Sequence, residues 1–589
     1  MKHLALTLAA TACLLAFPAG AVQDNQNPEP TTRSNAPREA VQAADYMVSA
    51  ANPLAVQAGV DVLAKGGNAV DAAIATQMAL NVVEPQSSGI GGGGFMLYFD
   101  AASKKLHVYD GRETAPKAAN AKLFLDDAGQ PLPHMEAVQG GRSVGTPGLV
   151  KMLALAHGKH GTLEWSGLFD HAIQLAGSGF PLSPRLHTLL DTFPHVHDFP
   201  QSVAPYMTAD GTLKKVGETV INLPMADALG IIAINGADAF YHGALADEIV
   251  AAVRKSPIAP GLLAKDDFTA YEAKEREPAC APYRIYTICS MPPPSSGGVT
   301  IVQALAILNA LPQDLAGMDA LSVDAIHLVA EASKLAYADR NHYLADPDFV
   351  KVPTQAMLDA DYLAKRASLM DDNRATDTAP PGNPVTGEAV LDVPATEAGQ
   401  EPPSTTHISV VDSKGNAVAM TTSIEYGFGS GLSAHGFLLN NQLTDFSFSP
   451  TLPDGSPHPN RVEAGKRPRS SMSPTMVFDE NGDLLLVTGS PGGARIITYV
   501  LQHLIAVLDW KMDVQTAISL PHYLNMNGAT ELEADTELES RAAELEARGH
   551  EVRIQQTPSG IHSIHILPDG TLSGGADPRR EGIAQGGAL

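Results

Sequence analysis

Hydrophobic residues in the first part of the chain recur at helical spacing and then give way to a short apolar run. One predicted helix places three apolar residues on a single face, namely Val56, Val60 and Leu63. This helix is expected to end at Gly66-Gly67. Asn68 is placed to cap a second helix, which must end near Pro85. After a glycine-rich loop, residues 95–99 form an apolar run that predicts a short strand.

The later part of the chain predicts a helix, a linker and then strands. Residues 292–298 form a loop rich in Pro, Ser and Gly that opens a predicted helix over 299–311. Residues 382–403 are dense in Pro, Gly, Glu and Thr and predict a flexible linker. Strands are expected beyond it, over 408–411, 417–424 and 484–488. An exposed linker therefore abuts a buried strand that begins with Thr405-Thr406-His407.

The first residues have the pattern of a secretory signal. Lys2 precedes an apolar stretch over 4–17, and Ala19-Gly20-Ala21 is a small-residue cleavage pattern. We therefore assign residues 1–21 to a signal peptide, which predicts a periplasmic or secreted protein. An uncleaved anchor and a lipoprotein attached through Cys13 are the alternatives.

Composition describes an acidic globular protein. Of 589 residues, 44% are hydrophobic and 18% are charged, which excludes wholesale disorder. Residues 22–44 lack periodicity and are rich in Gln, Asn, Pro and Thr, so we expect a disordered tether there. The formal net charge of −26 argues against nucleic acid or an anionic membrane as partner. No later apolar run reaches the length of a membrane span.

Cysteines and histidines do not form a recognisable metal-binding pattern. Cys280 and Cys289 flank a β-rich stretch, so in an oxidising compartment they could pair across neighbouring strands or stay free. Two cysteines without histidines at ligand spacing cannot fill a zinc site. The run His195-Val196-His197-Asp198 lies among prolines without a partner cluster, which favours a solvated loop. We predict no metal and no cofactor.

Two common enzyme motifs do not fit the chain. The glycine run over 89–94 follows a predicted helix and precedes a strand, whereas a dinucleotide-binding loop needs the opposite order. These glycines are expected to allow close backbone packing instead. The Gly-x-Ser-x-Gly elbow of α/β-hydrolases is absent, so a serine triad lacks its usual marker.

Thr405 can supply both a nucleophile and the base that it needs. A threonine hydroxyl is weak without an adjacent base. If the chain is cut between Ser404 and Thr405, the new α-amino group, with an ordinary pKa of about 7.7–8.0, can take that role. The same hydroxyl could make the cut, by attacking the Ser404 carbonyl to form an ester that water hydrolyses.

Motifs spread over nearly the whole mature chain resemble those of the gamma-glutamyltranspeptidase family. Residues 403–407, followed by 412–418, are similar to the family's processing site. The other matching segments are 66–73, 91–95, 145–148, 291–298, 439–442, 467–474, 489–493 and 576–579. Each is modest alone, but together, in one order and spacing, they are highly specific.

The resemblance implies an α+β fold of the N-terminal-nucleophile hydrolase type, a four-layer αββα sandwich. It also implies that one precursor cuts itself into two chains that form a heterodimer. The large chain would cover residues 45–404 after the tether, and the small catalytic chain residues 405–589.

The resemblance also assigns catalytic roles. Thr405 matches the nucleophile, and Ser423 matches a threonine that supports it in many relatives and keeps the hydroxyl. Gly492 and Gly493 match the oxyanion-hole glycines, whose backbone N–H groups would stabilise the tetrahedral intermediate.

Substrate contacts are implied in the same way. Arg112 matches the arginine that holds the α-carboxylate of a γ-glutamyl group, where its planar fork suits a carboxylate. Ser470 and Ser471 match hydroxyls that share this carboxylate. Gln442 and Asp445 match polar contacts to the α-ammonium.

Three departures affect the expected pocket. Glu425 stands where an asparagine is common, and its charge suits an α-ammonium. Thr444 replaces the first acid of an Asp-Asp pair, which leaves Asp445 alone. Residues 446–469 have no tyrosine and are shorter than the corresponding lid of many relatives, so we expect a more open pocket.

These observations predict an enzyme that hydrolyses glutathione and other γ-glutamyl amides and transfers the γ-glutamyl group to amino acids or dipeptides. A glutaryl-cephalosporin acylase is the rival enzyme. Glu425 and Asp445 would face a glutaryl group without its ammonium, and a site built for a polar partner rejects its absence by roughly 10⁴ or more. A binding protein without turnover would need a lost nucleophile or oxyanion loop, and both are present.

Overall fold

Two stacked β-sheets form the centre of the computed structural model, which describes residues 38–385 and 404–587. In the first sheet the strands follow the order β21-β2-β10-β11-β3-β4-β7, and every printed pair is antiparallel. These strands are β2 (Met47–Ala50), β3 (Gly93–Asp100), β4 (Lys105–Gly111), β7 (Lys274–Arg276), β10 (Thr406–Val411), β11 (Ala417–Ser423) and β21 (Ile583–Gly586).

The second sheet packs face to face on the first, where β10 and β11 contact β15 and β19. Its order is β1-β20-β19-β15-β14-β9-β8. The strands are β1 (Val41–Ala43), β8 (Ala279–Tyr283), β9 (Tyr286–Ser290), β14 (Thr475–Phe478), β15 (Leu484–Gly489), β19 (His562–Ile566) and β20 (Leu572–Ala576). The small sheets are β5 (Phe180–Pro181) with β6 (Thr219–Val220), β12 (Ser433–Ala434) with β13 (Phe437–Leu438), and β16 (Tyr523–Asn525) with β17 (Thr530–Glu533) and β18 (Val552–Gln555).

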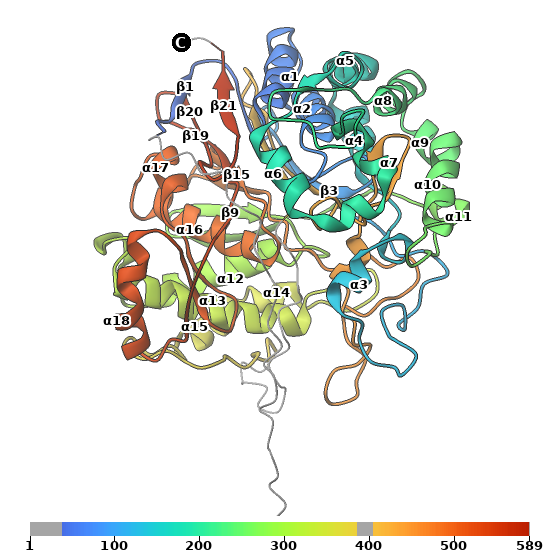
Figure 1. Cartoon of the computed structure of the whole chain (residues 1–589). Coiled ribbons are helices and arrows are strands. Elements are labelled where there is room, and N and C mark those ends of the chain that lie inside the picture. The colour runs from blue at the N-terminus through green and yellow to red at the C-terminus, as the bar shows by residue number, and fades with distance from the viewer. Residues whose placement is uncertain (1–37, 386–403, 588–589) are drawn as a thin grey trace, which may run out of the picture.

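Helices cover both outer faces of the sheet pair (Figure 1). The first sheet is covered by α1 (Pro53–Ala64), α2 (Ala69–Val83), α4 (Leu149–His160), α5 (Asp170–Ser178) and α8 (Leu223–Asn235). The second is covered by α12 (Gly297–Ala310), α13 (Val323–Tyr343), α15 (Ala360–Ala367), α16 (Ile496–Leu508) and α17 (Val514–Ser519). The remaining α-helices are α3 (His134–Val138), α6 (Pro184–Thr192), α7 (Pro200–Val203), α9 (Asp238–His242), α10 (Ala244–Arg254), α11 (Lys265–Thr269), α14 (Thr354–Met357) and α18 (Ala542–Ala547). The predicted four-layer αββα sandwich is confirmed.

Alternation along the central strands explains why both faces are buried. In β3, Phe95 and Leu97 pack with side chains of the second sheet, whereas Met96 and Tyr98 pack with α1 and α2. Side chains of a strand point alternately to its two faces, so a continuous apolar run fits a strand covered on both sides. The cap of α2 also follows the sequence, because Asn68 and Asp71 form a capping box.

The N-terminal boundary of the ordered protein differs from the prediction. Val41–Ala43 form β1, which pairs with β20, so the expectation of a disordered tether through residue 44 is wrong for these residues. Arg38 fixes this end, because its guanidinium donates to backbone carbonyls of the C-terminal segment, including that of Gly582 at 2.9 Å. The rest of the predicted tether and the signal peptide lie outside the described residues.

Two other open points are answered by the fold. Cys280 and Cys289 form a disulfide between β8 and β9. The predicted solvated loop over 195–198 is wrong in part: these residues belong to the 3₁₀-helix η3 (Pro194–Asp198), and only His197 and Asp198 are exposed. His195 is buried there against Phe193 and Tyr426.

Segments on both sides of the Ser404–Thr405 bond contribute to both sheets. In the first sheet β10 and β11 lie between β2 and β3, and in the second β14 lies next to β9. A cut at this bond would therefore leave two interleaved polypeptides. Of the helices in the described part of the chain, none has the length and apolarity required to cross a membrane.

Candidate active site

Thr405 lies at the start of β10 and borders a pocket between loops from both halves of the chain. The pocket, called the Thr405 pocket below, is lined by Arg112, Thr405, Ser423, Glu425, Gln442, Asp445, Ser470, Ser471, Met472, Gly493 and Ile496. Every residue for which the sequence predicted a catalytic or substrate-binding role is among them, except Gly492, the neighbour of Gly493. Residues 446–469 contribute nothing to this lining, and the expected shortening of a lid stays a prediction.

The hydroxyl of Thr405 faces that of Ser423. Their oxygens are 3.0 Å apart, and both residues are buried. Ser423 is the last residue of β11, and its oxygen also accepts from the backbone N–H of Glu425 at 2.8 Å. Ser423 can therefore hold the threonine side chain in one rotamer, with its hydroxyl directed at the pocket.

Thr405 has an unusual backbone conformation. Its φ is 132°, a value that β-branched residues rarely adopt. Such a conformation costs on the order of 1–3 kcal/mol and persists only where the surroundings enforce it. Ser404, directly before it, is fully buried and anchored by a hydrogen bond from its hydroxyl to the Gln86 carbonyl at 3.0 Å. Strain is thus concentrated beside the Ser404–Thr405 bond.

Gly492 and Gly493 form the turn between β15 and α16. Their φ values are 137° and 60°, and a Cβ on Gly492 would lie 2.6 Å from the ring of Tyr499. Only glycine fits this first position without strain. The turn leads through the 3₁₀-helix η7 (Gly493–Arg495) into α16, so its backbone N–H groups belong to a helix N-terminus, which favours a developing negative charge.

One side of the Thr405 pocket carries hydrogen-bond donors. Arg112 follows β4 and is fully buried, and its Nε donates to the Pro468 carbonyl at 3.1 Å. Its Nη1 has no hydrogen-bond partner among the described residues. Ser470 and Ser471 lie on the same side, on a segment held by the loop over 292–298, where Ser470 N donates to the Pro294 carbonyl at 3.1 Å.

Three further lining residues carry acceptor oxygens: Glu425, Gln442 and Asp445. Gln442 and Asp445 belong to the 3₁₀-helix η6 (Gln442–Asp445), where the Gln442 amide donates to Asp445 Oδ2 at 2.7 Å. Arg112 forms a short ion pair with the same Asp445 oxygen. Glu425 accepts a short hydrogen bond from the amide of Asn441. Two carboxylates and an arginine therefore border the same pocket, so the pocket carries both negative and positive charges.

Glu113 is a buried acid beside Arg112 that the sequence did not single out. Burial raises the pKa of its carboxyl to about 8, and the nearby Arg112 guanidinium only partly opposes this rise. Neither carboxyl oxygen has a hydrogen-bond partner among residues 38–385 and 404–587. Glu113 is accordingly protonated at neutral pH, so it does not neutralise Arg112.

Glu113→Gln should change how stability depends on pH. The folded protein holds a proton on Glu113 between the ordinary pKa of 4.5 and about 8, whereas the unfolded chain loses it. The stabilisation is fully present below the lower pKa and is lost as pH rises through the upper pKa. Over this range the free energy of unfolding falls by at most about 1.4 kcal/mol per pH unit. The free energy of unfolding, measured with urea from pH 4.5 to 8.5, should decline less steeply with pH in Glu113→Gln than in the unmutated protein. Glu480→Gln, at an exposed site, is the control. Parallel profiles of stability against pH for the unmutated protein and both variants would refute the assignment.

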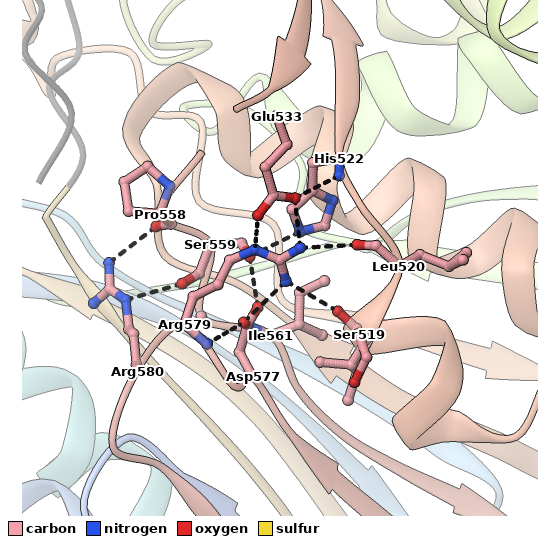
Figure 2. Close-up of polar contacts among 12 residues, drawn as sticks. Ser519, Leu520, His522, Glu533, Pro558, Ser559, Ile561, Asp577, Arg579 and Arg580 are labelled. Atoms are coloured by element: carbon pink, nitrogen blue, oxygen red, sulfur yellow. Dashed lines mark hydrogen bonds and ion pairs between the residues drawn. The ribbon is translucent and has the colours of Figure 1, made fainter. Parts of the chain in front are cut away.

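Two arginines of the C-terminal segment, Arg579 and Arg580, make polar contacts with backbone carbonyls and buried carboxylates (Figure 2). Arg580 donates to the carbonyl of Thr405 at 3.1 Å and to that of Ser559 at 3.1 Å. Beside it, Arg579 lies between Glu533 and Asp577, with ion pairs of 2.6 and 3.2 Å. Burial opposes ionisation of Asp577, but the Arg579 guanidinium outweighs it and holds the pKa of that carboxyl well below its usual range.

Several of these contacts were not anticipated from the sequence. Asn441 lies in a segment that matched the family, and Arg580 directly follows one, so a signal existed for both. Met472 also lies in a matching segment, 467–474, whereas the apolar pocket residue Ile496 lies outside all of these segments. Arg340, on α13, donates to Ser471 Oγ at 2.6 Å and could not be placed there from the sequence.

A cluster of possible metal ligands exists away from the Thr405 pocket, formed by His327, Glu331 and His550. Its groups already bond one another or neighbours: the two imidazoles share a hydrogen bond of 2.9 Å, and Lys334 pairs with Glu331 at 2.8 Å. A buried hydrogen-bond network therefore accounts for this cluster of side chains. The absence of a metal stays a prediction.

Known proteins that are similar to this chain include glutathione hydrolases and acylases. The gamma-glutamyltranspeptidase family model matches residues 55–587. The glutathione hydrolase proenzyme of Escherichia coli (strain K12) is 40% identical over 92% of this chain and 91% of its own length. The acylase ACY 1 proenzyme of Pseudomonas sp. (strain SE83) is 34% identical over 92% of this chain and 94% of its own length.

Solved structures agree with the fold. A cephalosporin acylase from Bacillus halodurans matches with a TM-score of 0.82 at 28% identity, covering 94% of this chain and 98% of that one. A gamma-glutamyltranspeptidase from Pseudomonas nitroreducens matches with a TM-score of 0.52 at 33% identity, covering 58% of this chain and 97% of that one. Because the family model and the curated relatives extend over nearly the whole sequence, this chain belongs to the gamma-glutamyltranspeptidase family of enzymes.

Proposed function

We propose that the protein cuts itself before Thr405 and then uses this threonine to hydrolyse γ-glutamyl amides such as glutathione, or to transfer the γ-glutamyl group to an amino acid or dipeptide. The observation that carries the proposal is the combination of polar groups that line the Thr405 pocket. Arg112, Ser470 and Ser471 suit an α-carboxylate, and Glu425 and Asp445 suit an α-ammonium, within one pocket that Thr405 also borders.

Maturation begins with attack of Thr405 Oγ1 on the carbonyl carbon of Ser404. The C–N bond breaks, the nitrogen gains the proton that leaves the Thr405 hydroxyl and becomes the new α-amine, and an ester joins Ser404 to Oγ1. Water then hydrolyses the ester and leaves a free carboxylate on Ser404 and a free hydroxyl on Thr405. Cleavage also removes the constraint on φ at Thr405, whose value of 132° is strained in the intact chain. This relief favours the cut state.

Turnover uses the same hydroxyl on the substrate. Thr405 Oγ1 adds to the γ-carbonyl carbon while its proton passes to the α-amine, which is the ordinary arrangement for an N-terminal threonine. The oxyanion is stabilised by backbone N–H groups at Gly492 and Gly493, and loss of one such donor typically costs about 10²–10³ in rate. The amine product leaves with the returned proton. Water, or an amine acceptor, resolves the γ-glutamyl ester on Thr405.

A cephalosporin acylase is the second candidate, since relatives with acylase names match the chain at similar length. A glutaryl group carries the carboxylate but not the ammonium. In the Thr405 pocket it would bring a third negative charge toward Glu425 and Asp445 without a cation to separate them. Leaving buried polar groups without their partner is strongly unfavourable, which favours the γ-glutamyl substrate.

A direct comparison of two chromogenic substrates tests the proposal. We expect kcat/KM for γ-glutamyl-p-nitroanilide to exceed that for glutaryl-p-nitroanilide by at least about two decades, the size expected when a charged hydrogen-bond partner is absent. Release of p-nitroaniline measures both. Equal rates, or a preference for glutaryl, would instead identify an acylase.

Export completes the proposal. The signal-like pattern over 1–21 and the disulfide between Cys280 and Cys289 both fit a protein that matures outside the cytoplasm, because structural disulfides persist in oxidising compartments. A periplasmic or secreted location agrees with this chemistry.

A further inference from the structure

The two serines of the Thr405 pocket have their oxygen atoms occupied from behind. Arg340 Nη2 donates to Ser471 Oγ at 2.6 Å, and the backbone N–H of Met472 donates to Ser470 Oγ at 3.1 Å. Guanidinium and backbone N–H groups are donors only. Each serine oxygen therefore acts as an acceptor toward the protein.

The hydroxyl protons of these serines are consequently directed elsewhere. A hydroxyl carries one proton and two lone pairs, and in residues 38–385 and 404–587 neither Ser470 Oγ nor Ser471 Oγ donates to a protein acceptor. Both residues line the Thr405 pocket. A ligand group beside them must accept two O–H bonds, and a carboxylate, with two acceptor-only oxygens, does so.

Arg340 connects the two serines through one rigid side chain. It is fully buried on α13, and its Nε donates to Ser296 Oγ at 2.8 Å. Ser296 in turn donates to the carbonyl of Ser470, from both its hydroxyl and its backbone N–H, at 2.7 Å each. The guanidinium also lies over the ring of Tyr337, 5.5 Å from its centroid, which restricts its movement.

We propose that Arg340 is a positioning residue that makes the Thr405 pocket specific for a carboxylate. It does not line the pocket; it fixes Ser471 as a hydrogen-bond donor and, through Ser296, fixes the segment that carries Ser470. The inference rests on the proposed function, in which the carboxylate is the α-carboxylate of a γ-glutamyl group. A lysine at this position has a single ammonium and no fixed fork, so it cannot hold Ser296 and Ser471 in the same geometry.

Substrate selectivity separates this role from a merely structural one. γ-Glutamyl-p-nitroanilide and 4-aminobutyryl-p-nitroanilide share the ammonium and the scissile amide and differ only in the α-carboxylate. Arg340→Met should lower kcat/KM for the γ-glutamyl substrate about tenfold, mainly through KM, as expected for a lost hydrogen bond to a charged group. The 4-aminobutyryl rate should change less than twofold, and Arg340→Lys should restore part of the selectivity.

Arg366→Met is the matched control. Arg366 is also a buried arginine in contact with α13, where its Nη2 donates to the Leu335 carbonyl at 2.9 Å. It does not contact Ser470 or Ser471, so its removal should leave the ratio of the two substrates unchanged. Equal losses on both substrates in Arg340→Met, or the same change of ratio in Arg366→Met, would overturn the inference.

Two further measurements keep the test decisive. If Arg340→Met does not fold, Ser296→Ala removes the hydroxyl that joins Arg340 to the Ser470 carbonyl while leaving the guanidinium in place. An unchanged substrate ratio in this variant and in Arg340→Lys would overturn the inference. If the unmutated enzyme does not cleave γ-glutamyl-p-nitroanilide, the proposed function fails by itself. The carboxylate preference is then measured with glutaryl- and butyryl-p-nitroanilide, and equal rates for these two would refute it separately.

Discussion

Thr405→Ala should remain a single chain without measurable γ-glutamyl-amide hydrolysis. The substitution removes the oxygen that attacks both the Ser404 carbonyl and the substrate, so neither ester can form. Loss of a catalytic nucleophile in comparable hydrolases costs roughly 10⁴–10⁶ in kcat. A denaturing gel and N-terminal sequencing measure the cut, and p-nitroaniline release measures the activity. The unmutated protein should show two chains, the smaller beginning at Thr405.

The structure allows this loss to be assigned to the hydroxyl rather than to backbone strain. Alanine keeps a Cβ, so the φ of 132° remains unfavourable at position 405, and the burial of Ser404 is unchanged. Thr405→Ser keeps the oxygen and should be cut and active, with reduced rates. Thr406→Ala, which removes the neighbouring hydroxyl bonded to Glu84 at 3.4 Å, should still be cut. Appearance of two chains in Thr405→Ala without added protease would refute self-cleavage.

The sequence predicted the framework well where local pattern and tertiary packing agree. The expected strands over 408–411 and 417–424 correspond to β10 and β11, and the structure pairs Thr406–Val411 with Ala417–Thr422. The glycine run was correctly interpreted as close packing, since a Cβ on Gly92 would overlap the Ser423 carbonyl. In these places the local preference of the sequence agrees with the packing that the fold imposes.

Predictions failed where a distant segment decides the outcome. The polar residues around β1 have no strand pattern, and they become ordered only because β20 provides an unpaired edge. His195 lies between prolines, yet it is buried against the ring of Tyr426, more than 200 positions away. Such contacts leave no periodicity in the local sequence.

The same distinction holds for the candidate site. Residues within matching motifs, such as Arg112 and Ser470, were placed by resemblance. Glu113 and Arg340 were missed because their importance comes from burial and from contacts across the fold, 0% exposed in both cases. Function at these positions depends on what surrounds a charge, and only the structure gives that information.

Asp445→Asn should reduce kcat/KM for γ-glutamyl-p-nitroanilide by roughly ten- to a hundredfold. The carboxylate lies in the Thr405 pocket, held by the Gln442 amide at 2.7 Å and by an ion pair with Arg112. Asparagine preserves shape and removes only the charge that would bind the substrate ammonium, and a hydrogen bond to a charged group contributes about 1.5–3 kcal/mol. Self-cleavage should survive, because it involves only Thr405 and its immediate neighbours.

Glutaryl-p-nitroanilide should respond differently to the same change. It has no ammonium, so it loses nothing, and removal of a negative charge near its own carboxylate should leave its rate unchanged or higher. Arg112→Ala provides the complementary case, since both substrates carry the carboxylate, and both should fall. Asp454→Asn, at an exposed site on the 446–469 segment, is the control and should change neither substrate. If Asp445→Asn lowered both substrates equally, Asp445 would serve only to orient Arg112, and the assignment of this pocket to a zwitterion would be wrong.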